Sequence, residues 1–171
     1  MKKLDAISVR EKYAIKIVKE LSGRKAQLVL DPTLLLTQDE WNSVANTKMS
    51  LPKNGYILAY YMSTTSLLER VTRHLKKVTG LPVINIKPSK LQMIFGSDIL
   101  AQDAGPCEFL SYYKNASYIV TNSLHGTIFS INYHKPFYTG LLPDSGKNSV
   151  NSRLTGLLEL LDKSERLITD K

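Results

Sequence analysis

Short apolar runs alternate with longer segments in which the apolar residues recur with the spacing of one helix face. The apolar runs predict strands over residues 6–9, 27–30, 56–60, 82–86, 118–121 and 136–138. The periodic segments predict helices over residues 10–21, 106–116, 124–133 and 151–161, a short helix from Thr37, and a longer one from Ser63 or Thr64 to Gly80. Residues 87–105 and 139–148 show neither pattern, so we expect an irregular loop in the first range and a mobile loop in the second. This alternation predicts an α/β fold: a Rossmann-like three-layer domain with a mostly parallel sheet.

Capping signals support several helix boundaries. Gly23 and Gly80 each follow the last periodic residue of a helix, where a glycine in the left-handed conformation commonly ends the helix. Thr37, followed three residues later by Glu40, forms the pattern of a capping box. These signals place helix ends at positions that agree with the hydrophobic pattern.

Composition narrows the class of protein. The chain has 171 residues, of which 43% are hydrophobic and 22% charged, so we expect one folded domain with its own core. Its formal net charge is +8, but the lysines and arginines are spread along the chain, which favours a solvated surface over a nucleic-acid patch. An anionic substrate or an acidic membrane face remains compatible with this charge. Cys107 is the only cysteine, so no internal disulfide can form.

The most informative polar segment follows the predicted strand 118–121. A helix start comes next, and free backbone N–H groups at a helix N-terminus attract anions. Ser123 and Thr127 add hydroxyl groups, His125 can donate a hydrogen bond or move a proton near neutral pH, and Gly126 would allow a close approach of a ligand or of backbone. The alternative is simple capping by Asn122 or Ser123, and the chemistry of the segment leaves both interpretations open.

Two arginines are further candidates for anion binding. Arg10 follows the first predicted strand, and the adjacent Glu11 could orient it; a guanidinium can hold a carboxylate or a phosphate in a bidentate manner. Arg153 opens the last predicted helix. Each of them also has a plain interpretation as a surface charge or as an ordinary ion-pair partner. We find neither a glycine-rich phosphate loop nor a set of residues with metal-ligand spacing, and we expect no metal.

Several segments resemble, in order, the motifs of polysaccharide pyruvyltransferases. The signature segment of that family resembles residues 121–130 (TNSLHGTIFS), followed by 135–137 (KPF). The other matching segments are residues 7–11 (ISVRE), 31–36 (DPTLLL), 56–60 (YILAY), 105–110 (GPCEFL) and 151–154 (NSRL). The ordered set covers nearly the whole chain and is more specific than any one segment.

The resemblance implies a function in bacterial cell-surface polysaccharide synthesis, such as that of a capsule or exopolysaccharide. The enzyme would transfer a pyruvyl group from phosphoenolpyruvate to two hydroxyls of a sugar, as a ketal, and would need no cofactor. Residues 1–171 would form the C-terminal, donor-binding domain of a glycosyltransferase-B-like pair, with the N-terminal domain absent. His125 would be the catalytic acid. The substrate-binding residues would be Arg10, Ser123, Gly126, Thr127 and Arg153.

Partners and location follow from the same resemblance. The acceptor would be a sugar or a lipid-linked oligosaccharide, and no nucleic acid would be bound. The protein would be cytoplasmic, with association with the inner face of the membrane and self-association left open. Alone, the chain would be inactive, and a partly apolar face near Arg10 and the last helix would be exposed.

Two other functions remain open at this point. A domain of this fold could belong to a sugar-nucleotide-dependent glycosyltransferase, because fold does not fix function. It could also be a non-catalytic binding module of the same fold. If the chain is a donor domain, Arg10 and His125 should both lie at the carboxyl edge of one parallel sheet, where ligands of such sheets bind.

Overall fold

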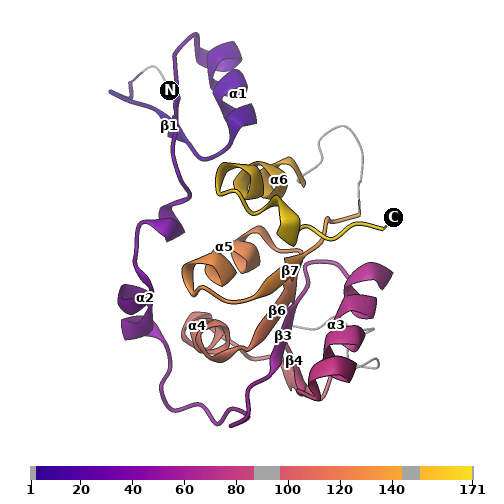
Figure 1. Cartoon of the computed structure of the whole chain (residues 1–171). Coiled ribbons are helices and arrows are strands. Elements are labelled where there is room, and N and C mark those ends of the chain that lie inside the picture. Colours follow the sequence, from indigo (N-terminus) through magenta and orange to yellow (C-terminus); the bar gives the residue numbers. More distant parts are fainter. Residues whose placement is uncertain (1–2, 87–96, 144–150, 171) are drawn as a thin grey trace. The chain divides into compact units, whose positions relative to one another are not determined.

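The computed structural model describes residues 3–86, 97–143 and 151–170. The chain divides into two compact units (Figure 1), which we call the N-terminal unit (Met1–Leu36) and the C-terminal unit (Thr37–Lys171). Each unit has its own parallel sheet.

The N-terminal unit is a small β-α-β arrangement. Strands β1 and β2 pair in parallel, with Ser8 opposite Gln27. The elements of this unit are β1 (Ser8–Val9), α1 (Lys12–Ser22), β2 (Gln27–Leu28) and the 3-10 turn η1 (Pro32–Leu34). Gly23 ends α1 as expected: its φ of 70° lies in the left-handed region, and its N–H donates to the carbonyl of Lys19.

Helix α1 is strongly amphipathic, and part of its apolar surface faces solvent. Val18 is buried, whereas Tyr13 and Leu21 are 60% and 72% exposed. These exposed side chains agree with the part of the expectation that concerns the surroundings of Arg10, and a face shared with the last helix stays a prediction. Whether a missing domain or self-association covers these apolar side chains stays a prediction.

The C-terminal unit contains a five-stranded parallel sheet in the order β5-β4-β3-β6-β7. Its strands are β3 (Ile57–Tyr60), β4 (Val83–Ile86), β5 (Ile99–Ala101), β6 (Tyr118–Thr121) and β7 (Phe137–Thr139). Its helices are α2 (Gln38–Val44), α3 (Ser66–Thr79), α4 (Pro106–Asn115), α5 (Leu124–Asn132), α6 (Asn151–Leu160) and the 3-10 turn η2 (Ser164–Arg166). The predicted fold class, Rossmann-like with a mostly parallel sheet, is confirmed.

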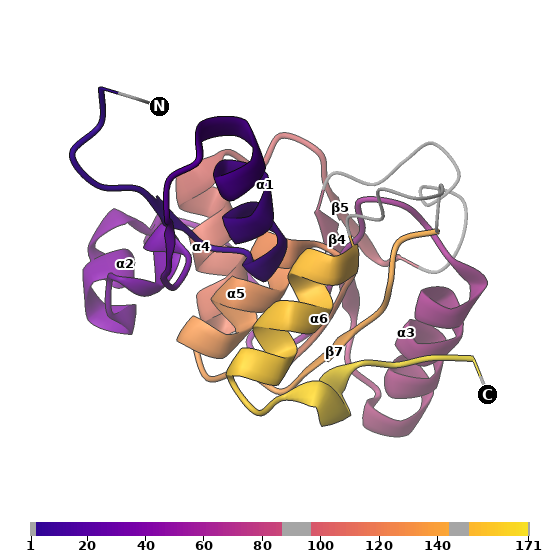
Figure 2. The same ribbon diagram turned by 90° about the horizontal axis from the view of Figure 1, so that it is seen from above.

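Helices cover both faces of this sheet, so the unit has three layers (Figure 2). On one face, α4, α5 and α6 enclose a core that includes Leu58, Ile119 and Phe129. On the other face, α3 covers a second core that includes Ile57 and Leu68. Because alternate residues of a strand point to opposite faces, the neighbours Ile57 and Leu58 belong to different cores.

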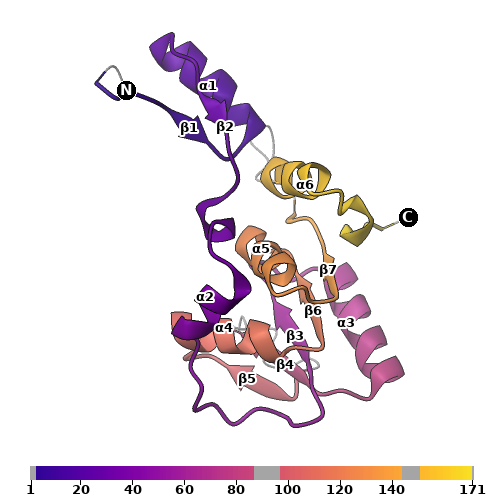
Figure 3. The ribbon, with the colours of Figure 1, turned by 60° about the vertical axis from the view of Figure 1, so that its left-hand side comes forward.

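Helix α2 lies against α4 (Figure 3) and brings the single tryptophan into the first core. The ring of Trp41 packs edge-on against Phe129, with ring centroids 5.2 Å apart. The capping box predicted at its start is confirmed: the Thr37 N–H donates to Glu40 Oε2 at 2.7 Å, and the Glu40 N–H donates to Thr37 Oγ1 at 3.3 Å.

Three expectations from the sequence are wrong. The strand near Arg10 does not join the sheet that leads to His125, because β1 and β2 form a separate sheet in another unit. Residues 87–105 are not a loop throughout, since β5 pairs with β4 as an edge strand. The cap of α3 is Thr65, whose Oγ1 accepts from the Leu68 N–H, rather than Ser63 or Thr64.

Two expectations fall partly outside the described residues. The loop expected over 139–148 begins with Thr139 as the last residue of β7, and residues 144–150 are not described. Residues 87–96 of the first expected loop are not described either. Within the described ranges, no helix has the length and apolar character that crossing a membrane requires.

Candidate functional site

The order of the strands creates a topological switch point at the carboxyl edge of the C-terminal sheet. From β3 the chain proceeds through β4 to β5 on one side, and β6 and β7 then lie on the other side. Helix α3 leaves β3 toward one face of the sheet, and α5 leaves β6 toward the opposite face (Figure 2). When the helices that follow two neighbouring strands pack on opposite faces of a sheet, the loops between strand and helix separate. Ligands of parallel α/β sheets usually bind between such loops. The two loops begin at Tyr61 and Asn122.

Asn122 joins these two loops. Its side chain is only 2% exposed, and both ends of its amide are used. Its Oδ1 accepts a hydrogen bond of 2.8 Å from the Met62 N–H, and its Nδ2 donates one of 2.6 Å to the Ser63 carbonyl. The Thr121 hydroxyl adds a third link by donating to the Tyr60 carbonyl at 2.6 Å. These bonds fix the position of one loop relative to the other.

Ser123 begins α5 as its N-cap. Its hydroxyl accepts from the Gly126 N–H at 3.2 Å, and its own N–H donates to the Thr121 hydroxyl at 3.0 Å. The capping interpretation of Ser123 is therefore confirmed. With its side chain committed in this way and 5% exposed, Ser123 positions the first turn of α5.

His125 is the second residue of α5 and is exposed. Among the described residues, neither its side chain nor the backbone N–H groups of Leu124 and His125 donate a hydrogen bond. An exposed imidazole therefore lies beside two free amides at a positive helix end. This arrangement can bind an anion and hold a proton next to it.

Gly126 and Thr127 lie behind this turn, in the interior. A Cβ atom added at Gly126 would lie 2.5 Å from the Thr121 hydroxyl and 2.8 Å from the Tyr113 hydroxyl, so the close packing there requires glycine. Thr127 is fully buried, and its hydroxyl lies 3.1 Å from that of Thr139. The structure gives both residues a packing role, and the predicted contact with substrate stays a prediction.

Arg153 belongs to the first turn of α6. The side chain of Asn151 attaches this turn to the segment after β7, because it donates to the Leu142 carbonyl and accepts from the Leu142 N–H, both at 2.9 Å. The strand-end segment is held in turn by a bond from the Gly140 N–H to the Thr121 carbonyl. The beginning of α6, and Arg153 with it, is therefore anchored at the carboxyl edge that carries His125.

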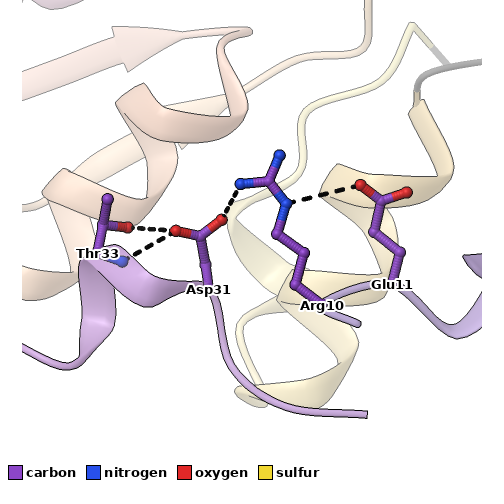
Figure 4. A network of polar contacts seen from close by, with 4 residues as sticks. All are labelled: Arg10, Glu11, Asp31 and Thr33. Atoms are coloured by element: carbon purple, nitrogen blue, oxygen red, sulfur yellow. Dashed lines mark hydrogen bonds and ion pairs between the residues drawn. The ribbon is translucent and has the colours of Figure 1, made fainter. Parts of the chain in front are cut away.

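Arg10 lies in the N-terminal unit within a network of polar contacts (Figure 4). Its Nη1 donates to Asp31 Oδ2, and its Nε lies 3.8 Å from Glu11 Oε1. Thr33 donates to Asp31 Oδ1 from both its N–H, at 3.0 Å, and its hydroxyl, at 2.7 Å. Burial by itself would raise the pKa of Asp31, but the bonds from Thr33 and the guanidinium of Arg10 outweigh it and keep this pKa below the ordinary value.

This network orients Arg10 without using all of its donors. Among the described residues, the Nη2 group of Arg10 makes no hydrogen bond, and the side chain is 34% exposed. An anion could therefore bind the free edge of the guanidinium. Asp31, the first residue of the motif segment 31–36, is the residue that positions Arg10.

The structure thus brings together some of the predicted site residues. Ser123, His125 and Arg153 are contributed by the carboxyl edge of the C-terminal sheet, and Arg10 belongs to the other unit. Asn122 was considered in the sequence only as a cap, and its link between two loops was missed. Its only signal was a polar residue directly after a buried strand. No group of three or more His, Cys, Asp or Glu side chains in the described ranges could hold a metal ion.

A parallel three-layer α/β unit of this kind defines a Rossmann-like protein. The model of the polysaccharide pyruvyl transferase family matches residues 1–145. The chain belongs to this family, as the ordered motifs indicate.

Solved structures with a similar arrangement include two bacterial proteins. One is UDP-GlcNAc 2-epimerase from Neisseria meningitidis bound to UDP-GlcNAc, with 9% identity and a TM-score of 0.47 over 88% of this chain and 51% of that chain. The other is a protein from Listeria monocytogenes assigned as a UDP-N-acetylglucosamine 2-epimerase, with 11% identity and a TM-score of 0.46 over 95% of this chain and 52% of that chain. The present chain spans about half the length of each. No curated protein matches the sequence.

Proposed function

We propose that this chain supplies the donor site of a transferase that moves a pyruvyl group from phosphoenolpyruvate to a pair of sugar hydroxyls. The observation that carries the proposal is the exposed His125 beside two free amides at the start of α5. Membership of a pyruvyl transferase family supports the reaction type. The surrounding residues support a site for a small dianionic donor.

The donor carries a phosphate and a carboxylate, and the site offers complementary groups for both. The amides of Leu124 and His125 and the positive end of α5 would bind one anionic group. Arg153, anchored at the same sheet edge, would contribute a cation to the other. Arg10 lies in the N-terminal unit, and its role in binding the donor stays a prediction.

His125 would act as the general acid. In the first step, a sugar hydroxyl attacks the enol carbon of phosphoenolpyruvate and releases its proton, while the terminal methylene takes a proton from the acid and becomes a methyl group. In the second step, the neighbouring sugar hydroxyl attacks the same carbon, loses its proton, and phosphate leaves with the electron pair of the broken C–O bond. The first step needs a proton donor and the second needs stabilisation of the departing phosphate. An imidazolium at position 125 could meet the first need, and the amides with Arg153 the second.

The remaining parts of the activity belong to the same proposal. The acceptor would be a sugar or a lipid-linked oligosaccharide at the cytoplasmic side of the membrane, and the product a capsule or exopolysaccharide. The chain would form one half of a glycosyltransferase-B-like pair and would need the other half for turnover.

Titration of phosphoenolpyruvate by calorimetry tests this proposal. His125→Ala should weaken binding about 5- to 150-fold, the equivalent of 1–3 kcal/mol for a hydrogen bond to a charged group. The melting temperature should change little, because the side chain is exposed and has no partner among the described residues. His74→Ala, which removes an exposed histidine from α3, serves as the matched control and should leave the affinity unchanged.

Two outcomes would contradict the proposal. Unchanged affinity of His125→Ala, together with a lower melting temperature, would give His125 a structural role only. Binding of uridine diphosphate without competition from phosphoenolpyruvate would instead indicate a site for a sugar nucleotide.

A further inference from the structure

Helix α3 presents a row of basic side chains to solvent. Arg70, Arg73, His74 and Lys77 recur at intervals of three and four residues, which places them on one face of the helix, and all four are exposed. The opposite face of α3, with Leu68 and Leu75, is buried against the sheet. The row therefore points away from the body of the C-terminal unit, and it belongs to the face of the sheet opposite α4, α5 and α6 (Figure 2).

The row keeps an excess of positive charge after its acidic neighbours are counted. Arg70 pairs with Asp170, and Lys76 pairs with Asp98 at 2.6 Å. Glu69 is partly exposed on the same helix. Arg73 and Lys77 have no ion pair within the described residues. Since both existing pairs are solvent-exposed, each holds its partners together only weakly.

An apolar groove runs beside this row. It has a volume of about 330 Å³ and lies between α3, β7 and the segment that follows η2. Its lining consists of Leu67, Val71, Leu75, Tyr138 and Ile168, together with Arg70 and His74. The hydrogen bond from the Ile168 N–H to the Thr139 carbonyl, 2.8 Å long, holds the last of these segments against β7. Met62 and Val78, close to the two ends of α3, are also exposed.

We propose that this α3 face docks on the surface of an anionic phospholipid bilayer. Lipid phosphates would contact the basic row, and the groove would receive the adjoining apolar part of a lipid. A basic row alone would suit any polyanion, but a basic row next to an open apolar groove matches the two-part chemistry of a lipid interface. A nucleic acid offers phosphates without an apolar layer beside them. The proposal does not depend on the donor site, which lies at the carboxyl edge of the sheet.

Sedimentation with sucrose-loaded vesicles tests the proposal on the full chain. We expect binding to vesicles of phosphatidylglycerol and phosphatidylethanolamine, weaker binding as salt is added, and little binding to phosphatidylcholine alone. The variant Arg73→Gln with Lys77→Gln should lower the partition coefficient roughly thirtyfold, because each basic residue near the surface contributes about a fivefold factor. The variant Lys48→Gln with Lys53→Gln removes the same charge from exposed positions in the C-terminal unit and should bind nearly as the wild type does.

A separate variant tests whether the apolar groove contributes to vesicle binding. Leu67→Asn should lower the partition coefficient about fivefold, whereas Leu160→Asn, at an exposed position of α6, should not change it. Circular dichroism spectra and melting temperatures of all variants would show that the fold is retained.

Three results would overturn the proposal. The wild type could fail to bind the anionic vesicles. The two double variants could lose vesicle binding equally, which would mean that binding depends on the net charge of the protein and not on the α3 face. The α3 double variant could bind vesicles normally and lose affinity for a DNA duplex, which would make the surface a nucleic-acid site.

Discussion

Replacing Asn122 by Ala should loosen the two loops at the carboxyl edge of the C-terminal sheet. The change removes two hydrogen bonds, of 2.8 Å from the Met62 N–H and of 2.6 Å to the Ser63 carbonyl, and with them the link between the loops after β3 and β6. Each such bond contributes about 0.5–1.5 kcal/mol, so we expect a loss of about 1–3 kcal/mol in the free energy of unfolding. The loss stays in this range because Met62 is exposed and its freed N–H can bind water.

The fluorescence of Trp41 provides the assay. Trp41 is the only tryptophan and packs against Phe129 in the core of the C-terminal unit, so its emission follows the unfolding of this unit. In a chain of this size, a loss of 2 kcal/mol corresponds to a decrease of roughly 4–8 °C in the melting temperature. The affinity for phosphoenolpyruvate should decrease as well, because the loop that carries Ser123 would no longer be fixed.

Asn115→Ala is the matched control. Asn115 is exposed and makes one hydrogen bond, from its Nδ2 to the Ser111 carbonyl at 2.8 Å within α4. Its removal should cost clearly less than the removal of Asn122. If the two variants unfold at the same denaturant concentration and both bind the donor normally, the link through Asn122 does not hold the two loops together and the reasoning is wrong.

Two further variants and their controls test the packing and the electrostatics. Gly126→Ala should destabilise the C-terminal unit by about 1–3 kcal/mol, because its Cβ would overlap the hydroxyls of Thr121 and Tyr113. The control Gly156→Ala in α6 has open space around its Cβ and should be neutral or stabilising. Equal changes in the free energy of unfolding in urea would contradict this prediction. Since the pKa of Asp31 is lowered in the folded protein, its contribution to stability is present above its unfolded pKa of about 3.9 and is lost as the pH falls through the folded value. Asp31→Asn should therefore be less stable than the wild type at pH 7 and approach it in acid, and a difference that does not depend on pH would exclude the ionised carboxylate as the cause.

Local sequence signals fixed the type and many of the ends of the helices and strands. The capping box at Thr37 and Glu40 and the glycines that end α1 and α3 act through bonds within a few residues, so their effect could be predicted from short patterns. The cap of α3 was misplaced because Ser63, Thr64 and Thr65 all have hydroxyls suited to capping. In the folded unit, the bond from Asn122 to the Ser63 carbonyl holds Ser63 in the loop before the helix, and Thr65 provides the cap.

What the sequence by itself determined is the α/β class, the family and the segment that carries His125, since all of these depend on residue order and local periodicity. The partition of the strands between two sheets was decided only by the tertiary structure. Short strands such as β1, β2 and β5 exist only because a neighbouring strand completes their hydrogen bonds. The local sequence does not show which strand that neighbour is. The same holds for the link between Asn122 and Ser63, for the pair of Arg10 with Asp31, and for the groove beside α3, because each joins residues that no local pattern connects.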